Sequence, residues 1–500
     1  MTRDRLRWLS RPAAVATVVG ALLLAPGPAV AHSLSLTYQS RLPLVVYLLG
    51  AGMTVALSFA FVLLADVRAD PPRVPTTGKL PPALLRLGLR AIGLLGWIWI
   101  VAQGIAGGSS LADVATLFLW VYGWVGIAIL SAFVGPVWHW LDPFATIFDL
   151  GAWICRAVGL SGWEAAEYPA RLGRWPAIIG FVFFIWLELV GNGMGSGTLF
   201  IVLVGYTAFT LAMMAQFGRD AWRRDGETFS VWFRLLNRLA TFTLVDDEGH
   251  VRRRSFASGL LEPGWRTQDV LLIALGTGSI LFDGLSQTTP WFTVFGAPDM
   301  AIKTLQLVGF LGVIAIAALA VSRLVGTAAT GAGLLPIAVG YLVAHYFTYL
   351  FIDGQRIIVA VADPLQQGWD LGGFGWAFFQ PNSSWFPPGL VWTIQIAAVV
   401  GGHMLGAWGG HVVAAGASVA RPGVGSHRRR QVPLAVIMVF LTTLTLWSLG
   451  QSLVVEQPAA ASAASVASAA SAASTASTSA SKSRSVRFRT SLENTPAPLI

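Results

Sequence analysis

The sequence predicts an all-α fold, a polytopic bundle of transmembrane helices. Of its 500 residues, 55% are hydrophobic and only 11% are charged, and the mean hydropathy is +0.66. A soluble chain carries about 25% charged residues, because polar side chains must meet the water at its surface. Here the charges lie in short segments between apolar runs of about twenty residues, the length with which a helix crosses a bilayer. These features exclude a soluble enzyme.

The N-terminal segment, residues 1–31, is typical of a signal peptide. A start with three arginines precedes an apolar stretch at 13–24, and Ala29-Val30-Ala31 matches the small-x-small pattern of a cleavage site. Cleavage there makes His32 the first residue of the mature protein, on the outer side of the membrane. An uncleaved first helix is the alternative, because signal peptides and membrane anchors differ mainly in length and flanking residues.

The mature chain contains about ten apolar segments, which we expect to form one bundle over residues 32–456. The expected spans are 41–65, 88–108, 112–134, 175–193, 197–216, 269–287, 304–323, 333–352, 389–416 and 432–453. Two of them are irregular. The third contains Asp113, and the sixth contains Gly276 and Gly278, which is compatible with a broken or re-entrant segment.

The distribution of basic residues predicts the orientation. With His32 outside, the arginines concentrate in segments that face the cytoplasm, above all 135–174 and 217–268, while the opposing loops hold almost none beyond Arg356. We therefore expect a multi-pass protein of the plasma membrane with its N-terminus outside. The same asymmetry accounts for the net charge of +9 without a nucleic-acid partner. The predicted partner is the lipid bilayer, and the oligomeric state is left open.

Two regions are expected to lie outside the bilayer core. In the 217–268 loop, tryptophan and phenylalanine residues alternate with arginines, which indicates an amphipathic helix on the membrane surface with its arginines toward the lipid headgroups. From Gln457 to Ile500 the chain is dominated by Ala and Ser. Such a composition cannot form a core, so we expect residues 457–500 to be a disordered tail.

Polar side chains inside the apolar segments are the candidate functional residues, because an ionisable group costs about 2.5–3.5 kcal/mol at the bilayer centre. The predicted topology brings most of them to the outer ends of their helices, where they would line a polar cavity open to the outer face. The candidate ligand-binding residues are Glu188, Asn192, Asp283, Gln287, His345, Tyr349, Asp353 and His403. The alternative is that each forms an isolated interhelical hydrogen bond worth about 0.6 kcal/mol.

Three histidines are candidate ligands of a metal ion or a haem. His345 and His403 could ligate one metal ion or a haem from two helices. An N-terminal His32 could bind copper through its amine and imidazole together. The sequence contains no CxxCH or HExxH motif, and its single cysteine, Cys155, has no spaced partner for a zinc site.

Four short motifs stand close to these polar residues. They are Phe282-Asp283-Gly284-Leu285-Ser286-Gln287 followed by Trp291, His345-Tyr346-Phe347 with Gly354-Gln355, Asp363-Pro364 with Gly368-Trp369-Asp370, and Gly402-His403. Together they resemble the motifs of an actinobacterial family of multi-pass membrane proteins often labelled "fenitrothion hydrolase". The resemblance covers most of residues 32–416. It implies the same membrane fold and, from the label, hydrolysis of an organophosphate.

Three classes of function follow. We favour a protein that binds or transports a small solute or metal ion through the outer polar cavity. The second class is a membrane-bound hydrolase, which the resemblance implies, although the sequence has no Gly-x-Ser-x-Gly elbow. The third is a membrane scaffold or assembly subunit without a small ligand.

Overall fold

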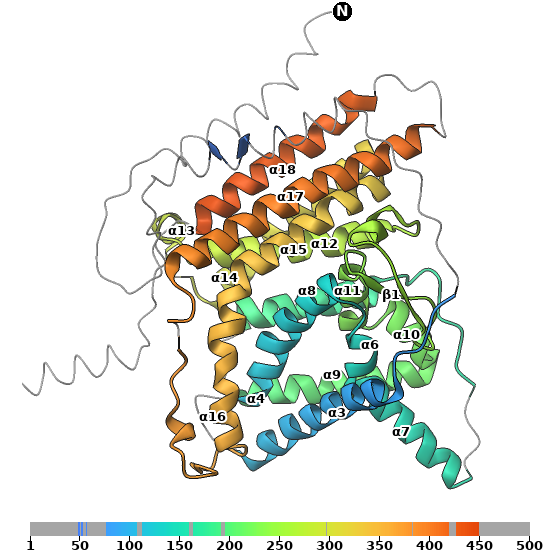
Figure 1. The fold of residues 1–500 in the computed structure, drawn as a ribbon, viewed down its shortest axis with the longest axis vertical. Coiled ribbons are helices and arrows are strands. Elements are labelled where there is room, and N and C mark those ends of the chain that lie inside the picture. The colour runs from blue at the N-terminus through green and yellow to red at the C-terminus, as the bar shows by residue number, and fades with distance from the viewer. Residues whose placement is uncertain are drawn as a thin grey trace, which may run out of the picture. The chain divides into compact units, whose positions relative to one another are not determined.

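The computed structural model describes residues 77–107, 113–159, 164–191, 196–296, 298–382, 384–419 and 427–449, with a few positions between 49 and 57 (Figure 1). Several predictions fall outside these residues. They concern the signal peptide, His32, most of the expected span at 41–65, Asn192 and the tail from Gln457. Those predictions remain predictions.

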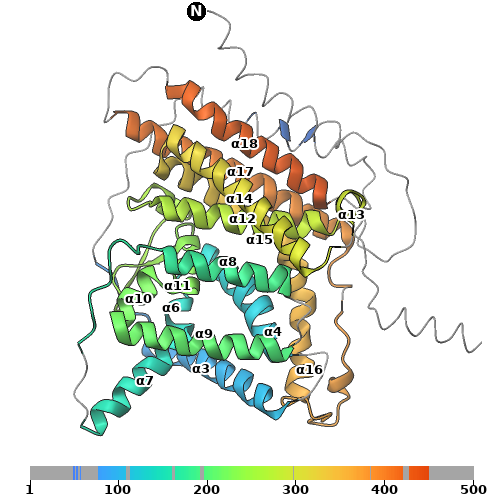
Figure 2. The ribbon, with the colours of Figure 1, turned by 180° about the vertical axis from the view of Figure 1, so that it is seen from behind.

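The described residues form an almost entirely helical bundle, as expected (Figures 1 and 2). The long helices are α3 (Ala83–Ala106), α8 (Trp175–Leu189), α9 (Ser196–Phe217), α12 (Thr267–Ser286), α14 (Met300–Val325), α15 (Thr327–Ile352), α17 (Pro388–Val419) and α18 (His427–Leu449). A further apolar segment consists of α4 (Val114–Thr116), the π-helix η1 (Leu117–Ile127) and α5 (Ala128–Phe133). Each expected span from 88–108 onward coincides with one of these segments. Within the described ranges, seven helical segments are long and apolar enough to cross a membrane.

The surfaces of the outer helices suit a lipid environment. Leu84 on α3 is 82% exposed and Leu305 on α14 is 73% exposed, and both belong to long apolar helices. Contact of such apolar faces with water is unfavourable, whereas contact with lipid hydrocarbon is not. By contrast, α12 is almost wholly buried and packs against α8, α14, α15 and α18. It is the central helix of the bundle.

The two irregular spans have simple explanations. Asp113 lies just before α4 and caps it, because its side chain accepts a hydrogen bond from the Thr116 amide at 2.8 Å. The expected break in the sixth span is wrong, since α12 is continuous from Thr267 to Ser286. Its glycines permit close packing: a Cβ at Gly276 would lie 2.8 Å from the Trp232 ring, and one at Gly278 would lie 3.0 Å from Leu311.

Helices α15 and α17 pack with their backbones in direct contact. A Cβ at Gly402 would lie 2.6 Å from the Pro336 carbonyl oxygen, and one at Gly406 would lie 2.3 Å from that of Gly333. Only glycine allows so close an approach, which is a common way for helices to associate inside a membrane.

The loop at 217–268 folds into the protein instead of lying on lipid. It contains α10 (Arg219–Asp225), α11 (Thr228–Leu236) and an antiparallel hairpin of β1 (Phe242–Leu244) and β2 (Val251–Arg253). Its aromatic residues are buried, Trp222 at 2% exposure and Trp232 at 4%, and α11 packs against α8. The predicted amphipathic helix is present, but protein covers its apolar face. An amphipathic pattern alone does not distinguish a helix whose apolar face packs on protein from one whose apolar face contacts lipid.

We call this folded region, together with α6 (Trp138–Leu141) and α7 (Pro143–Ala157), the basic cap. Its arginines pair with carboxylates. These pairs include Arg223–Asp142 at 2.9 Å, Arg219–Asp149 at 2.7 Å, Arg266–Asp225 at 2.7 Å, Arg252–Glu262 at 2.7 Å and Arg254–Glu262 at 3.0 Å. The cap therefore holds itself together by ion pairs around an aromatic core.

Short helices complete the described chain. They are α13 (Thr289–Phe295), α16 (Ile357–Ala362) and the 3-10 helices η3 (Ser258–Leu261), η4 (Asp353–Arg356) and η5 (Trp376–Phe378). Of these, α13 follows α12 directly, and η4 with α16 continues the line of α15. Both therefore extend from the end of α12 and α15 that lies away from the basic cap.

Candidate functional site

An aspartate and a histidine from two central helices form the core of the candidate site. Asp283 Oδ2 on α12 lies 2.8 Å from His345 Nε2 on α15. Gly284 lies beside this pair, and a Cβ there would lie 3.5 Å from the His345 ring, an ordinary van der Waals distance. One turn after Asp283, Gln287 donates a hydrogen bond to Asp283 Oδ1 at 2.6 Å. Both carboxylate oxygens are therefore engaged.

A tyrosine connects this pair to a second carboxylate. The Tyr346 hydroxyl lies 3.2 Å from Asp283 Oδ2 and 3.5 Å from Glu188 Oε1. His345 and Tyr346 are neighbours on α15, about 100° apart around the helix, so they reach the same oxygen of Asp283 from two sides. We call Glu188, Asp283, Gln287, His345 and Tyr346 the acidic cluster. Three helices, α8, α12 and α15, supply its members.

The second oxygen of Glu188 is the least satisfied atom of the cluster. Oε2 is buried and has no hydrogen-bond partner among the described residues. Across the same ranges, neither Glu188 nor Asp283 forms an ion pair with a lysine or arginine. A buried carboxylate without such compensation is costly. The arrangement therefore favours uptake of a proton or another cation.

The cluster reaches the surface at the C-terminal end of α12. The side chains of Asp283 and His345 are 15% and 21% exposed, and Gln287 is exposed. The partly exposed side of the cluster therefore lies at the end of the bundle opposite the basic cap.

The remaining candidates lie around the cluster or apart from it. The Tyr349 ring lies one turn along α15, with its centroid 6.3 Å from that of Tyr346. Asp353 in η4 pairs with Arg356 at 3.2 Å. His403 on α17 is fully buried, with Nδ1 at 2.8 Å from the Val399 carbonyl oxygen and its ring 5.6 Å from that of Tyr341. The structure thus brings Glu188, Asp283, Gln287 and His345 together, and it gives Asp353 and His403 other partners.

Sequence reasoning missed Tyr346, which is the residue that links the two carboxylates. Its signal was present in the His345-Tyr346 pair, since adjacent polar residues on a buried helix can converge on one partner. The hydroxyl of a tyrosine in an apolar segment needs a hydrogen-bond partner, and acids were available on the neighbouring helices.

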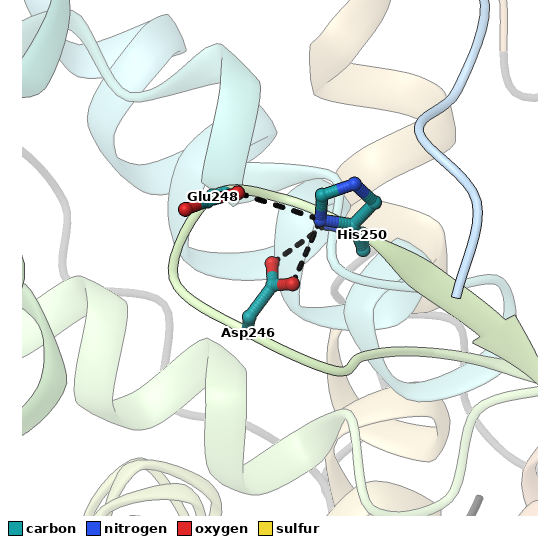
Figure 3. A group of neighbouring side chains, drawn as sticks. All are labelled: Asp246, Glu248 and His250. Atoms are coloured by element: carbon teal, nitrogen blue, oxygen red, sulfur yellow. Dashed lines mark hydrogen bonds and ion pairs between the residues drawn. The ribbon is translucent and has the colours of Figure 1, made fainter. Parts of the chain in front are cut away.

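A different group has the geometry of a metal site. Within the described residues, Asp246, Glu248 and His250 are the one set of three such side chains whose ligand atoms all lie within 4.8 Å of one another (Figure 3). They occupy the exposed turn between β1 and β2. Asp246 Oδ1 accepts hydrogen bonds from the Gly249 and His250 amides at 3.0 Å each, and Oδ2 lies 2.7 Å from His250 Nδ1. These contacts are explained by the turn itself. His345 and His403 belong to no such set.

Buried charge in the basic cap behaves differently from that in the cluster. Burial, with the nearby Arg223 and Arg234 guanidinium groups, lowers the pKa of His139 to about 2, so this imidazole is neutral. Burial also raises the pKa of Asp142 to about 6, while Arg223 and the backbone amides of Phe144 and Ala145 act to lower it. In the cap, buried Asp142 pairs with Arg223, while buried Glu227 accepts hydrogen bonds from the Tyr206 hydroxyl and from the Phe229 and Ser230 amides.

Comparisons with known proteins give no match to a protein-family model, to a curated protein or to a solved structure. Two of the motifs that suggested a family have clear structural roles. Asp363 accepts hydrogen bonds from the Gln367 and Gly368 amides at 2.8 and 2.9 Å. Gln355 binds the backbone of Asn382 through both ends of its amide, at 2.8 and 3.0 Å. These residues shape the segment that follows α15.

Proposed function

We propose that this membrane protein is a transport protein that binds a small cation, either a proton or a metal ion, at the acidic cluster. The observation that carries the proposal is the buried, unpartnered Oε2 of Glu188 beside the Asp283–His345 pair. Polar groups inside a membrane domain are expensive and tend to mark ion and proton pathways.

The chemistry of the cluster supports a cation over an anion. Its members are two carboxylates, an imidazole, a phenol and an amide, and the only ion pair of Asp283 in the described ranges is with His345. A proton on Glu188 would satisfy Oε2 and remove one negative charge. A metal ion would instead use carboxylate and imidazole ligands, after a movement that brings Glu188 closer to His345.

The access route also supports this proposal. The cluster opens at the end of α12 away from the basic cap, and basic residues face the cytoplasm in most membrane proteins. With that orientation, the cluster would take its cation from the outer compartment.

The experiment measures ion entry into liposomes that contain the purified protein. The probes are protons, followed by trapped pyranine, and Zn²⁺, Cu²⁺ and Mn²⁺, followed by trapped metal indicators. We expect the wild type to admit at least one of these ions faster than empty liposomes, and Asp283→Asn and Glu188→Gln to reduce that rate about tenfold or more.

Asp299→Asn is the matched control. Asp299 is an exposed carboxylate at the same end of the bundle, where it caps α14, and asparagine caps helices equally well. Its ion entry should equal that of the wild type. The proposal fails if the wild type admits none of the four ions, or if Asp283→Asn and Asp299→Asn behave alike. A scaffold role would then take its place.

The Asp283→Asn variant also tests the alternative function, hydrolysis. The Asp283–His345 pair resembles the acid and base of a hydrolase, but such an enzyme also needs a nucleophile against the imidazole. The Ser448 hydroxyl lies on the same side of Gly284 as His345, yet it donates to the Thr445 carbonyl oxygen at 3.1 Å. Release of a nitrophenol from an organophosphate, lost in both Asp283→Asn and Ser448→Ala, would establish the hydrolase instead.

A further inference from the structure

A cavity lies in the basic cap, where α6, α11 and the β1–β2 hairpin meet. Its volume is about 210 Å³, far above the roughly 15 Å³ that a single water molecule requires. The charged residues that line it are Arg223, Arg234, Arg238, Arg254 and Glu262. We call this cavity the arginine pocket. It lies toward the N-terminal end of α12, and the acidic cluster lies near the other end, roughly 24 Å along that helix from Thr267 to Asp283.

The pocket has an excess of positive charge. Its lining contains four arginines and one carboxylate. Two further carboxylates do not line the pocket but pair with its arginines: Asp142 contacts Arg223, and Asp247 contacts Arg234. Four cations therefore face three anions. His139, which also lines the pocket, is neutral and adds no negative charge.

Two polar groups in the lining are poorly satisfied. Arg234 has one contact with a carboxylate among the described residues, at 3.5 Å to Asp247, which leaves most of its N–H donors available. The Ser131 hydroxyl is fully buried and has no partner within the described ranges. Native proteins seldom leave a buried hydroxyl such as that of Ser131 unpaired unless a ligand or water completes it.

The other arginines are fixed in place. Arg238 donates to the carbonyl oxygens of Gly259, Glu262 and Pro263 at 3.0–3.2 Å and stacks on Trp265. Arg254 is held by the Ala240 carbonyl oxygen at 3.0 Å and by Glu262. These two guanidinium groups therefore give the pocket a fixed positive charge, and Arg234 retains the N–H donors that can contact an oxyanion directly.

We propose that the arginine pocket binds a phosphate group, with Arg234 and Ser131 as its direct donors. Ser131 lies in the last turns of α5, at the end of the apolar segment from Val114 to Phe133. The pocket therefore sits at the depth of lipid headgroups. The phosphate belongs either to a lipid headgroup or to a soluble phosphate compound.

The test uses the purified full-length protein and two probes. Inorganic phosphate is titrated by calorimetry at constant ionic strength. In parallel, protein in nanodiscs of phosphatidylcholine, with or without phosphatidic acid, is examined by native mass spectrometry for retained lipid. Saturable binding of inorganic phosphate identifies a soluble ligand, and selective retention of phosphatidic acid without phosphate binding identifies a lipid ligand.

Variants connect either result to the pocket. Arg234→Gln should weaken binding about 10- to 100-fold, because it removes a charge-assisted hydrogen bond. Ser131→Ala should weaken it several-fold and leave folding intact, since alanine fits where a buried hydroxyl has no partner. Arg253→Gln is the control: Arg253 is the exposed neighbour of Arg254 on the same hairpin and does not line the pocket.

Three results overturn the proposal. The first is that neither probe binds saturably. The second is that Arg253→Gln weakens binding as much as Arg234→Gln. The third is that Ser131→Ala, properly folded, binds as tightly as the wild type, which would place the ligand elsewhere. An Asp283→Asn variant should bind phosphate normally, so the failure of this proposal is distinguishable from failure of the proposed cation site.

Discussion

The two ends of α12 hold buried charge in opposite ways. At its N-terminal end, in the basic cap, Asp142 and Arg223 are almost fully buried and lie 2.9 Å apart, and Glu262 is shared by two arginines. At its C-terminal end, Glu188 and Asp283 have between them one imidazole, one phenol and one amide. The first end uses charge to hold its fold together. The second keeps charge that the fold does not compensate, which is expected where the charge serves a function.

The largest effect is expected in the cap. Asp142→Ala should destabilise the protein by about 3–5 kcal/mol, because it leaves Arg223 buried without its partner. It also removes the cap of α7, where Asp142 accepts from the Phe144 and Ala145 amides. Thermal or denaturant unfolding in detergent measures this loss.

Two controls separate these causes. Asp142→Asn retains a capping side chain and should recover about 1 kcal/mol of the loss. Asp149→Ala breaks a pair that is about one-third exposed, so it should change stability by less than about 1 kcal/mol. Equal losses for Asp142→Ala and Asp149→Ala would show that burial of the pair is not what matters.

The next effect is a pH dependence that belongs to the cap. The pKa of His139 falls from 6.5 to about 2 on folding. A folded pKa below the unfolded one contributes stability that is present above pH 6.5 and is lost as the pH falls toward 2. Between pH 7 and pH 5 this group should cost the protein about 2 kcal/mol. Unfolding of His139→Gln should lack this part of the acid sensitivity, and an unchanged pH profile would contradict the assignment.

The smallest effect is expected in the acidic cluster. Asp283→Ala and His345→Ala should each change the free energy of unfolding by only about 0.6 kcal/mol, the typical worth of a polar contact between membrane helices. A loss of several kcal/mol would mean that the cluster is structural, like the cap, and would remove the contrast between the two ends. Melting curves of both variants, compared with that of Asp142→Ala, distinguish a structural from a non-structural role of the cluster.

Hydropathy was sufficient to predict the membrane helices, because length and apolar composition decide whether a helix crosses a bilayer. Expected spans such as 269–287 and 304–323 coincide with α12 and α14, which are long and apolar enough to cross a membrane. The meeting of Glu188, Asp283 and His345 also followed from topology, since alternate helices end at the same side. Their use as a cation site remains a proposal.

The basic cap could not be predicted from the same patterns. Its arginines were interpreted as signals of orientation, and its aromatic residues as a membrane-facing surface. Both properties depend only on local composition, whereas the pairing of Arg223 with Asp142 joins residues 81 positions apart in the sequence. Ion pairs between residues distant in the sequence produce no periodic pattern. The cap and its pocket could therefore be identified only from the three-dimensional structure.

The backbone contact between α15 and α17 has a mechanical consequence. Gly402 and Gly406 leave no space between the two main chains, so these helices cannot roll or slide past one another without a collision. We therefore expect the two helices to move together, with His345 and Tyr346 on α15. If the acidic cluster opens and closes as a transport site, as we propose, the movement would come from the other side, from α8 or α12. The contact between Glu188 Oε1 and the Tyr346 hydroxyl is the longest in the cluster, at 3.5 Å. Separation of these two groups would mark the opening of the cluster.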